Sequence, residues 1–361
     1  MQQNGSTFIR ATLLPVVLLC VAATLSLYLK IDPYPVPRHH GELYAAYASG
    51  LGELHEVVAL RWLSPWIAHH LGVASEFSWM VFLYLSFLST VVIFYGATLR
   101  VTKDQVYAFL VALTPAVTTA GWYGVYCPGY PDWFVLAMLS ASLFVRSRLL
   151  ACAFAALALW SHERSLFLLA LAPVLRMLWF EERSAAWLRS EYLTLAAVVI
   201  AYFALRTHSV AVTPKCTVGF YGEELVNRLR HGHGLPTLAV IGGVLLHAYK
   251  AVLVPFAFAL WTLARKREEL GRISALVVLL AFFLTLVQFF VAVDYVRLVD
   301  VMVLLIVFAL AKAYAELPTA ERRWWRGLLL GALVVNQLLP VRYIAANVNV
   351  EIASFNVFAL W

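Results

Sequence analysis

The 361-residue sequence has little charge, few cysteines and no glycine-rich nucleotide-binding loop. Only 13% of its residues are charged, whereas 63% are hydrophobic and the mean hydropathy is +0.81. Because a soluble globular domain carries about one quarter charged residues, this composition excludes a protein folded mainly in water. The missing Walker and dinucleotide glycine patterns exclude the usual phosphate-cradling loops. The sequence contains no internal repeat of the kind that indicates a transporter built from inverted halves.

Cysteine and histidine are too sparse to indicate a metal centre. Of four cysteines, Cys127 and Cys216 lie between apolar runs, and an oxidising compartment would allow them to form a disulfide. The sequence leaves this disulfide open, because bonding depends on a geometry that spacing does not give. His39-His40 and His231-Gly232-His233 lack the added ligands of a dedicated metal site. No cofactor is therefore indicated, and one alternative stays open, a divalent metal ion held by carboxylates.

What the sequence has in abundance is long apolar runs. Runs of about 17 to 25 residues can cross a hydrocarbon core of about 30 Å as helices, and lipid favours helices because they pair every backbone amide. We predict about eleven spans, at Thr12–Leu29, Phe77–Leu99, Val106–Tyr123, Trp133–Val145, Leu149–Trp160, Ser165–Phe180, Tyr192–Leu205, Leu238–Leu263, Ile273–Val293, Leu298–Ala315 and Gly327–Leu339. The fourth and fifth are short, and the alternative is that they form a tight helical hairpin around Arg146 and Arg148. The predicted fold is all-α, a polytopic transmembrane helical bundle that forms one integral membrane domain over residues 1–361.

Lysine and arginine cluster in alternate loops, which predicts the orientation. Arg146 with Arg148 and Arg322 with Arg323 lie in short loops of one set, and such clusters stay in the cytoplasm. We therefore interpret the net charge of +7 as a topology signal rather than as a nucleic-acid-binding surface. The N-terminus is predicted to be cytoplasmic, the first run to be a retained span rather than a signal peptide, and the protein to reside in the bacterial inner membrane.

Under this orientation the longer outer segments are residues 30–75, 206–237 and the tail 340–361. The first contains a short helix predicted at Gly41–Tyr47 and a helical stretch at Val57–Leu71, in which Pro65 forces a kink or a restart. Tryptophan and tyrosine occur in these stretches, as is typical of helices in the membrane interface. We expect these interfacial helices to cover the outer end of the bundle.

Ionisable residues gather on the predicted outer face, near span ends. A carboxylate close to lipid is costly unless it is paired or lines a wet cavity, so their recurrence on one face indicates a site. The candidate catalytic acids are Asp32, Glu42 and Asp132. The candidate substrate-binding residues are the turn His162-Glu163-Arg164, then His247 and Lys250 within a long apolar run, and Asp294 with Arg297 one helical turn apart. For each of them a structural salt bridge or cap is the alternative.

The residue types of these groups suit different chemical roles. The planar guanidinium of Arg164 can bind two phosphate oxygens at once, and His162 or Glu163 can transfer a proton. His247 and Lys250 interrupt a stretch longer than a span requires, which suggests a separate half-helix with a cationic end that suits an anionic lipid headgroup. Snorkelling toward the interface is the alternative for Lys250.

These features resemble the GT-C superfamily of polytopic membrane glycosyltransferases. The similar pieces are Asp32 or Glu42 in a long first outer loop, the run Arg61-Trp62-Leu63-Ser64-Pro65-Trp66, Asp132 opening a span, His162-Glu163-Arg164, and Asp294 with Arg297. No paired Asp-Asp or Asp-Glu motif occurs in the first outer loop, so the identity of the catalytic acid stays open. The resemblance implies a polyprenyl-phosphate sugar donor and an outer carboxylate as general base. It also implies that Arg164, Arg297 and Lys250 bind the departing phosphate.

Two other functional classes stay open. A transporter or flippase of an anionic lipid or glycan intermediate would use the same cations, but the inner halves of the spans carry few polar residues to line its path. A non-catalytic membrane component of an envelope assembly complex would need no acid cluster. The expected partners are membrane lipid and, for the enzyme, a lipid-linked sugar donor. Nucleic acid is not expected, and no protein partner is indicated.

Overall fold

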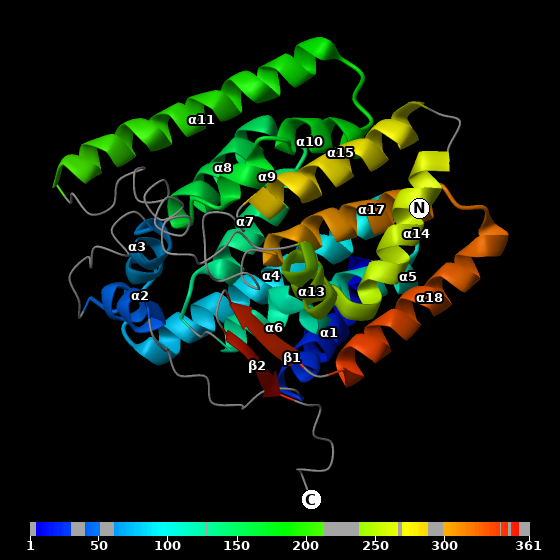
Figure 1. Ribbon diagram of the computed structural model, residues 1–361, viewed down its shortest axis with the longest axis horizontal. Coiled ribbons are helices and arrows are strands. Elements are labelled where there is room, and N and C mark those ends of the chain that lie inside the picture. Colours follow the sequence, from blue (N-terminus) through cyan, green and yellow to red (C-terminus); the bar gives the residue numbers. More distant parts are fainter. Residues whose placement is uncertain are drawn as a thin grey trace, which may run out of the picture.

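The fold is a helical bundle followed by a short β-hairpin (Figure 1). The computed structural model describes residues 5–29, 40–50, 61–126, 129–212, 238–265, 269–287, 299–339, 341–345 and 348–353. Its elements are α1 (Gly5–Tyr28), α2 (His40–Ala48), α3 (Leu63–His70), α4 (Glu76–Thr102), α5 (Gln105–Leu113), η1 (Thr114–Val117), α6 (Thr119–Tyr126), α7 (Asp132–Phe144), α8 (Arg148–Ser161), α9 (Ser165–Leu169), α10 (Ala172–Phe180), α11 (Ala185–Val212), α13 (Leu238–Tyr249), η3 (Lys250–Val252), α14 (Leu253–Arg265), α15 (Glu269–Leu286), η5 (Asp300–Met302), α17 (Val303–Ala315), α18 (Thr319–Leu338), β1 (Val341–Ala345) and β2 (Val348–Ala353).

Helix α17 forms the centre of the bundle. Its residues from Val303 to Tyr314 are all buried. It packs against α4, α5, α14 and α15, and Figure 1 shows it running among these helices. A helix that is apolar nearly all round has to be enclosed on every side. With 13 residues, α17 is about 20 Å long, so its two ends define two well-separated regions of the molecule.

Three helical segments of the described chain are long and apolar enough to cross a membrane: α4, residues Ala185–Leu205 of α11, and the run Leu238–Arg265 that contains α13, η3 and α14. Large apolar side chains are exposed on helices at the periphery of the bundle, including Leu14 on α1 and Phe283 on α15, as a lipid environment allows. These features are consistent with a membrane protein. The predicted count of about eleven spans is not confirmed. Helices such as α7 and α8, with 13 and 14 residues, reach only about 20 Å of a hydrocarbon core of about 30 Å.

Two predicted spans are divided where proline enters the chain. The predicted span Val106–Tyr123 consists of α5, η1 and α6, with Pro115 in the 3-10 turn. The predicted span Ser165–Phe180 consists of α9 and α10, and Pro173 lies in the first turn of α10. Because proline has no amide hydrogen and clashes with the preceding turn, each of these runs ends one helix and starts another.

Two short helices, α2 and α3, follow α1 in the segment predicted to hold interfacial helices. In α2 the buried residues Gly41, Tyr44, Ala45 and Ala48 recur at helical spacing, so one face of the helix is covered. Helix α2 packs on α3 and α4, and α3 packs on α4 and α8. Pro65 lies in the first turn of α3, so it marks a helix start rather than a kink. Both helices lie against the bundle.

The hairpin of β1 and β2 lies in the segment predicted only as an outer tail. The strands are antiparallel, with Tyr343 opposite Val350 and Ile344 opposite Asn349. Valine and isoleucine in both strands, and tyrosine in β1, favour extended backbone. Strand β1 contacts α13, so this tail returns to the bundle.

A buried arginine, Arg176, joins three helices on one side of the bundle. Its Nε donates to Glu191 on α11 at 2.9 Å, and its Nη1 donates to the carbonyl of Ser142 near the end of α7 at 2.6 Å. The last carbonyls of a helix have no partner within the helix. Arg176, from α10, therefore caps α7 and holds α11 by the same side chain.

The corner between α4 and α5 is tied to two later helices by Asp104. Its Oδ1 accepts the backbone N–H of Tyr107 at 3.0 Å, which caps α5. Its Oδ2 accepts hydrogen bonds from the Tyr314 hydroxyl on α17 and from Nε of Arg326 on α18, the latter at 3.0 Å. Burial alone would raise the pKa of Asp104, but these hydrogen bonds outweigh burial and hold the pKa below its ordinary value.

The lowered pKa of Asp104 predicts a pH-dependent contribution to stability. Because the pKa is lower in the folded chain, the contribution is complete above the ordinary value of 3.8 and is lost as the pH falls through the lowered value. Asp104→Asn keeps the cap but removes the charge. It should cost about 1 kcal/mol near neutral pH, a modest figure because the Arg326 side chain is 41% exposed.

Thermal unfolding of the two proteins in detergent, measured from neutral to acidic pH, checks this prediction. The difference between their midpoints should shrink as Asp104 becomes protonated. A difference that persists unchanged at low pH would contradict it.

Candidate functional site

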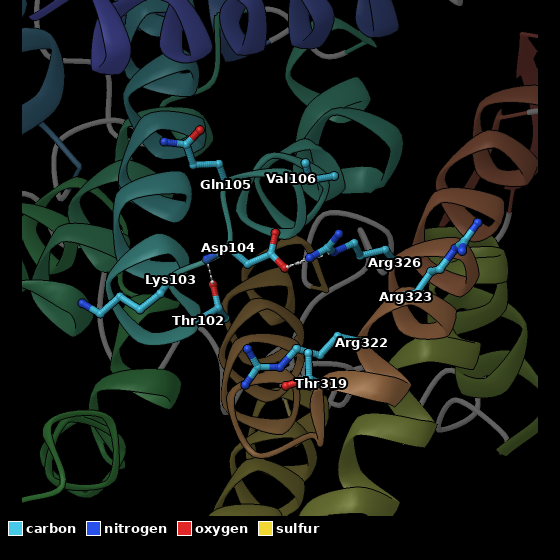
Figure 2. Close-up of a pocket in the computed structure, with 9 residues that line it drawn as sticks. All are labelled: Thr102, Lys103, Asp104, Gln105, Val106, Thr319, Arg322, Arg323 and Arg326. Atoms are coloured by element: carbon cyan, nitrogen blue, oxygen red, sulfur yellow. Dashed lines mark hydrogen bonds and ion pairs between the residues drawn. The ribbon is translucent and has the colours of Figure 1, made fainter. Parts of the chain in front are cut away.

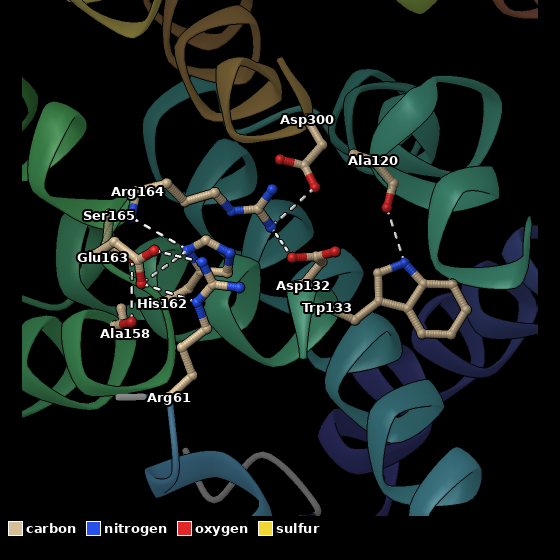
Figure 3. A network of polar contacts seen from close by, with 10 residues as sticks. All are labelled: Arg61, Ala120, Asp132, Trp133, Ala158, His162, Glu163, Arg164, Ser165 and Asp300. Atoms are coloured by element: carbon tan, nitrogen blue, oxygen red, sulfur yellow. Dashed lines mark hydrogen bonds and ion pairs between the residues drawn. The ribbon is translucent and has the colours of Figure 1, made fainter. Parts of the chain in front are cut away.

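Two helix starts bring a pair of carboxylates to one arginine (Figure 3). Asp132 is the first residue of α7, and Asp300 is the first residue of η5, which runs directly into α17. Arg164 lies in the turn between α8 and α9. Its Nη2 donates to Oδ1 of Asp132 and, at 3.3 Å, to Oδ2 of Asp300. Segments far apart in the chain thus meet in what we term the Arg164 cluster, consisting of Asp132, Arg164 and Asp300.

The Arg164 cluster is almost completely buried. The exposed fractions of Asp132, Arg164 and Asp300 are 2%, 3% and 3%. Two features offset the cost of burying these charges: the guanidinium lies between the carboxylates, and each carboxylate lies at the positive end of a helix dipole. With both acids ionised, the cluster holds one more negative than positive charge.

A second ion pair lies beside this cluster. Arg61, just before α3, donates from Nε to Oε2 of Glu163 at 3.0 Å and from Nη2 to Oε1, a bidentate geometry. Nδ1 of His162 lies 3.3 Å from the backbone N–H of Arg164 and 3.7 Å from Oε2 of Glu163. The segment before α3 is thus tied to the turn that holds Arg164.

The turn before Asp132 is held by close packing from α2 and α4. Gly129 has a φ of 96°, a conformation that glycine adopts without strain. A Cβ at this position would lie 2.8 Å from the backbone of Gly41. The indole Nε1 of Trp79 donates to the carbonyl of Gly129 at 3.0 Å. Glu42 directly follows Gly41 and is exposed, so this predicted acid lies on the helix that touches the Asp132 turn.

A helix break at Tyr249 and Lys250 lies next to the Arg164 cluster. Helix α13 ends at Tyr249 and α14 begins only after η3, which confirms the predicted interruption. The Tyr249 hydroxyl donates to the carbonyl of Val299, the residue before Asp300. Lys250 has a φ of 45°, which is strained for a residue with a Cβ. Its Nζ donates to the carbonyl of Leu339, just after α18, at 3.1 Å.

The structure brings some of the predicted site residues together. Asp132 and Arg164 share the cluster, and His162 and Glu163 flank it. Lys250 follows Tyr249, whose hydroxyl bonds the residue before Asp300, but its own ammonium bonds the carbonyl of Leu339. His247 is half-buried on α13. Outside the described residues lie Asp32, Asp294, Arg297, Cys127 and Cys216.

Two residues of the site, Asp300 and Arg61, had no assigned role in the sequence prediction. Asp300 opens an apolar run in the way that Asp132 does, and this signal could have identified it. Arg61 was part of the run that resembled the glycosyltransferases, but its partner Glu163 lies 102 residues away. Nothing in the local sequence links the two.

The described residues contain no group of three or more His, Cys, Asp or Glu side chains that could hold a metal ion. In the Arg164 cluster the guanidinium takes the position between two carboxylates that a divalent cation would need. The cluster therefore fits an arginine as its counter-charge and does not fit a metal ion.

No known protein family matches the chain, and no curated protein matches it. Function therefore has to be argued from the geometry and chemistry of the residues themselves.

Replacing Arg164 by methionine should destabilise the protein by about 3–5 kcal/mol, because two buried carboxylates lose their counter-charge. Thermal unfolding in detergent, followed by tryptophan fluorescence, measures the change. Arg146 offers a matched control, since its side chain is largely exposed in a 3.7 Å pair with Glu182. Arg146→Met should cost about 0–1 kcal/mol.

A triple variant separates charge from packing. Combining Arg164→Met with Asp132→Asn and Asp300→Asn should recover most of the lost stability, since no buried charge then lacks a partner. If the triple variant is no more stable than Arg164→Met, packing accounts for the cost and the ion-pair interpretation is wrong.

Proposed function

We propose that this protein is a membrane glycosyltransferase that transfers a sugar from a polyprenyl-phosphate donor to an acceptor on the outer face of the bacterial inner membrane, with its N-terminus in the cytoplasm. The observation that carries the proposal is the contact of Gly41 and Arg61, in the segment after α1, with the turns that hold Asp132 and Arg164. The similarity to the GT-C superfamily seen in the sequence supports the same arrangement.

A covered polar cluster beside lipid suits sugar transfer. Water competes with the acceptor for the sugar, so the reacting groups have to be shielded from it. Helices α2 and α3 provide such cover, because Gly41 touches the turn before Asp132 and Arg61 binds Glu163. Apolar helices long enough to cross a membrane support access for a lipid-linked donor.

In the proposed reaction a carboxylate takes the proton of the acceptor hydroxyl as its oxygen attacks the anomeric carbon. The bond between that carbon and the donor phosphate oxygen breaks, and the polyprenyl phosphate leaves as an anion. A cation near the leaving oxygen stabilises its growing charge. We assign the base to the segment after α1 and assign the Arg164 cluster the task of positioning that segment.

Among the described acids, Glu42 suits the role of base better than Asp132. Its side chain is exposed, and Glu42 takes no part in the ion pairs of the Arg164 cluster. Asp132 would have to weaken its bond to Arg164 in order to accept a proton. Asp32, outside the described residues, stays the alternative base.

The leaving phosphate needs a cation other than Arg164, whose guanidinium is engaged by two carboxylates. Lys250 is our candidate, because an ammonium can donate to phosphate oxygens and the residue beside it, Tyr249, bonds the turn that leads to Asp300. Arg297, outside the described residues, is the second candidate for the cation that binds the leaving phosphate.

The test uses purified protein in lipid vesicles with a panel of polyprenyl-phosphate sugars and measures the release of polyprenyl phosphate. Loss of a general base should slow release about 10²–10⁴-fold, in Glu42→Gln if Glu42 is the base and in Asp32→Asn if Asp32 is. Glu76→Gln, at an exposed acid in the first turn of α4, is the matched control and should keep the wild-type rate.

Wild-type rates in both Glu42→Gln and Asp32→Asn would show that neither carboxylate is the general base. Absence of release from every donor, combined with movement of the lipid-linked sugar across the vesicle membrane, would favour the transporter instead.

A further inference from the structure

A cavity of about 600 Å³ opens at the far end of α17 from the Arg164 cluster (Figure 2). It lies between the corner of α4 and α5 and the start of α18. The residues that line it are Thr102, Lys103, Asp104, Gln105, Val106, Thr319, Arg322, Arg323 and Arg326. Its volume is in the range of sites that bind small molecules.

The charge of this cavity is strongly positive. Four cationic side chains and one carboxylate line it, and that carboxylate, Asp104, is bonded by Arg326. Lys103, Arg322 and Arg323 form no salt bridge with any residue that the structure describes. Figure 2 shows Lys103 and Arg323 on opposite sides of the cavity, with Arg322 and Arg326 between them. An anion inside would therefore meet positive charge from several directions.

The guanidinium of Arg322 is held in place before any ligand arrives. Its Nε donates to the carbonyl of Leu317 at 3.2 Å and its Nη2 to the carbonyl of Ala315 at 3.4 Å, both at the end of α17. It also lies over the ring of Tyr314, 5.4 Å from the centroid. A side chain fixed in this way loses little entropy on binding an anion, and a planar fork suits phosphate oxygens.

Aromatic residues on the helices beside the cavity are of the kind that occurs at the level of lipid headgroups. Trp324, beside Arg323 on α18, is exposed and lies 5.7 Å from the ring of Phe258 on α14. Trp261, one turn further along α14, is also exposed, and Arg265 lies over its ring at 4.2 Å. Tryptophan and arginine at the ends of apolar helices are typical of the boundary between the hydrocarbon core and the headgroups.

We propose that this cavity binds a phosphate group, carried by an anionic phospholipid headgroup or by a soluble phosphate compound. The proposal does not depend on the glycosyltransferase activity, because the 13 residues of α17 separate this cavity from Asp300 by about 20 Å. Basic pockets between membrane helices are a common site for anionic headgroups.

The experiment compares Arg322→Gln/Arg323→Gln with Arg146→Gln/Arg148→Gln, a control pair of exposed arginines that removes the same charge from another loop. One arm measures retention of phosphatidylglycerol relative to phosphatidylcholine by native mass spectrometry of the solubilised protein. The other measures the shift in thermal midpoint caused by inorganic phosphate relative to chloride at equal ionic strength. The cavity pair should weaken binding about tenfold or more, and the control pair should not.

A selective loss in the phospholipid arm identifies a headgroup, and a selective loss in the inorganic phosphate arm identifies a soluble phosphate. Equal effects of the cavity pair and the control pair in both arms would overturn the proposal. If Arg322→Gln/Arg323→Gln does not fold, Lys103→Asn/Arg323→Gln replaces it, because both residues are exposed and asparagine tolerates the left-handed backbone at Lys103. A selective loss in either arm then supports the phosphate site, and effects equal to those of the control pair overturn it.

Discussion

Charge buried among apolar helices is the constraint on which the rest of this structure depends. Arg164 is held by two carboxylates at helix starts, and Arg176 by Glu191 together with a carbonyl near the end of α7. A guanidinium has five donors in a fixed plane, so one side chain can bind partners from several segments at once. Since a missing partner would leave charge in a medium that solvates it poorly, each arginine both offsets the acidic charge of its site and ties together helices that are distant in the chain.

Helix α17 connects the two polar ends of the molecule. Asp300, in the turn that leads into it, bonds Arg164, and Tyr314, in its last turn, bonds Asp104. Every residue between is buried, so the described part of the chain encloses this helix along its length. The burial of α17 supports our proposal of separate chemistry at each end over a transporter that moves a polar substrate along this helix.

Local sequence predicted the helical class and the types of residue at the site, but not their pairing. An acid at the start of an apolar run identified Asp132, and a lysine within an overlong run identified the break at Lys250, since both are costly in lipid without a structural reason. The partners of Arg164 lie 32 and 136 residues away, and no periodic pattern specifies contacts of that range. The predicted span count is not confirmed, and one physical reason is that Pro115 and Pro173 divide apolar runs that hydropathy alone treats as continuous.

The geometry of the Arg164 cluster also limits what a donor phosphate can do there. A phosphate that took Arg164 as its partner would release at least one carboxylate into a buried site, and that carboxylate would repel the phosphate. Asp300, at 3.3 Å, is the looser of the two partners, yet its release would disturb the turn into α17. A cation outside the cluster meets no such cost. The helix break at Tyr249 and Lys250 lies beside the cluster, because the Tyr249 hydroxyl bonds the carbonyl of Val299. Lys250 is therefore the cation that we propose for the leaving phosphate.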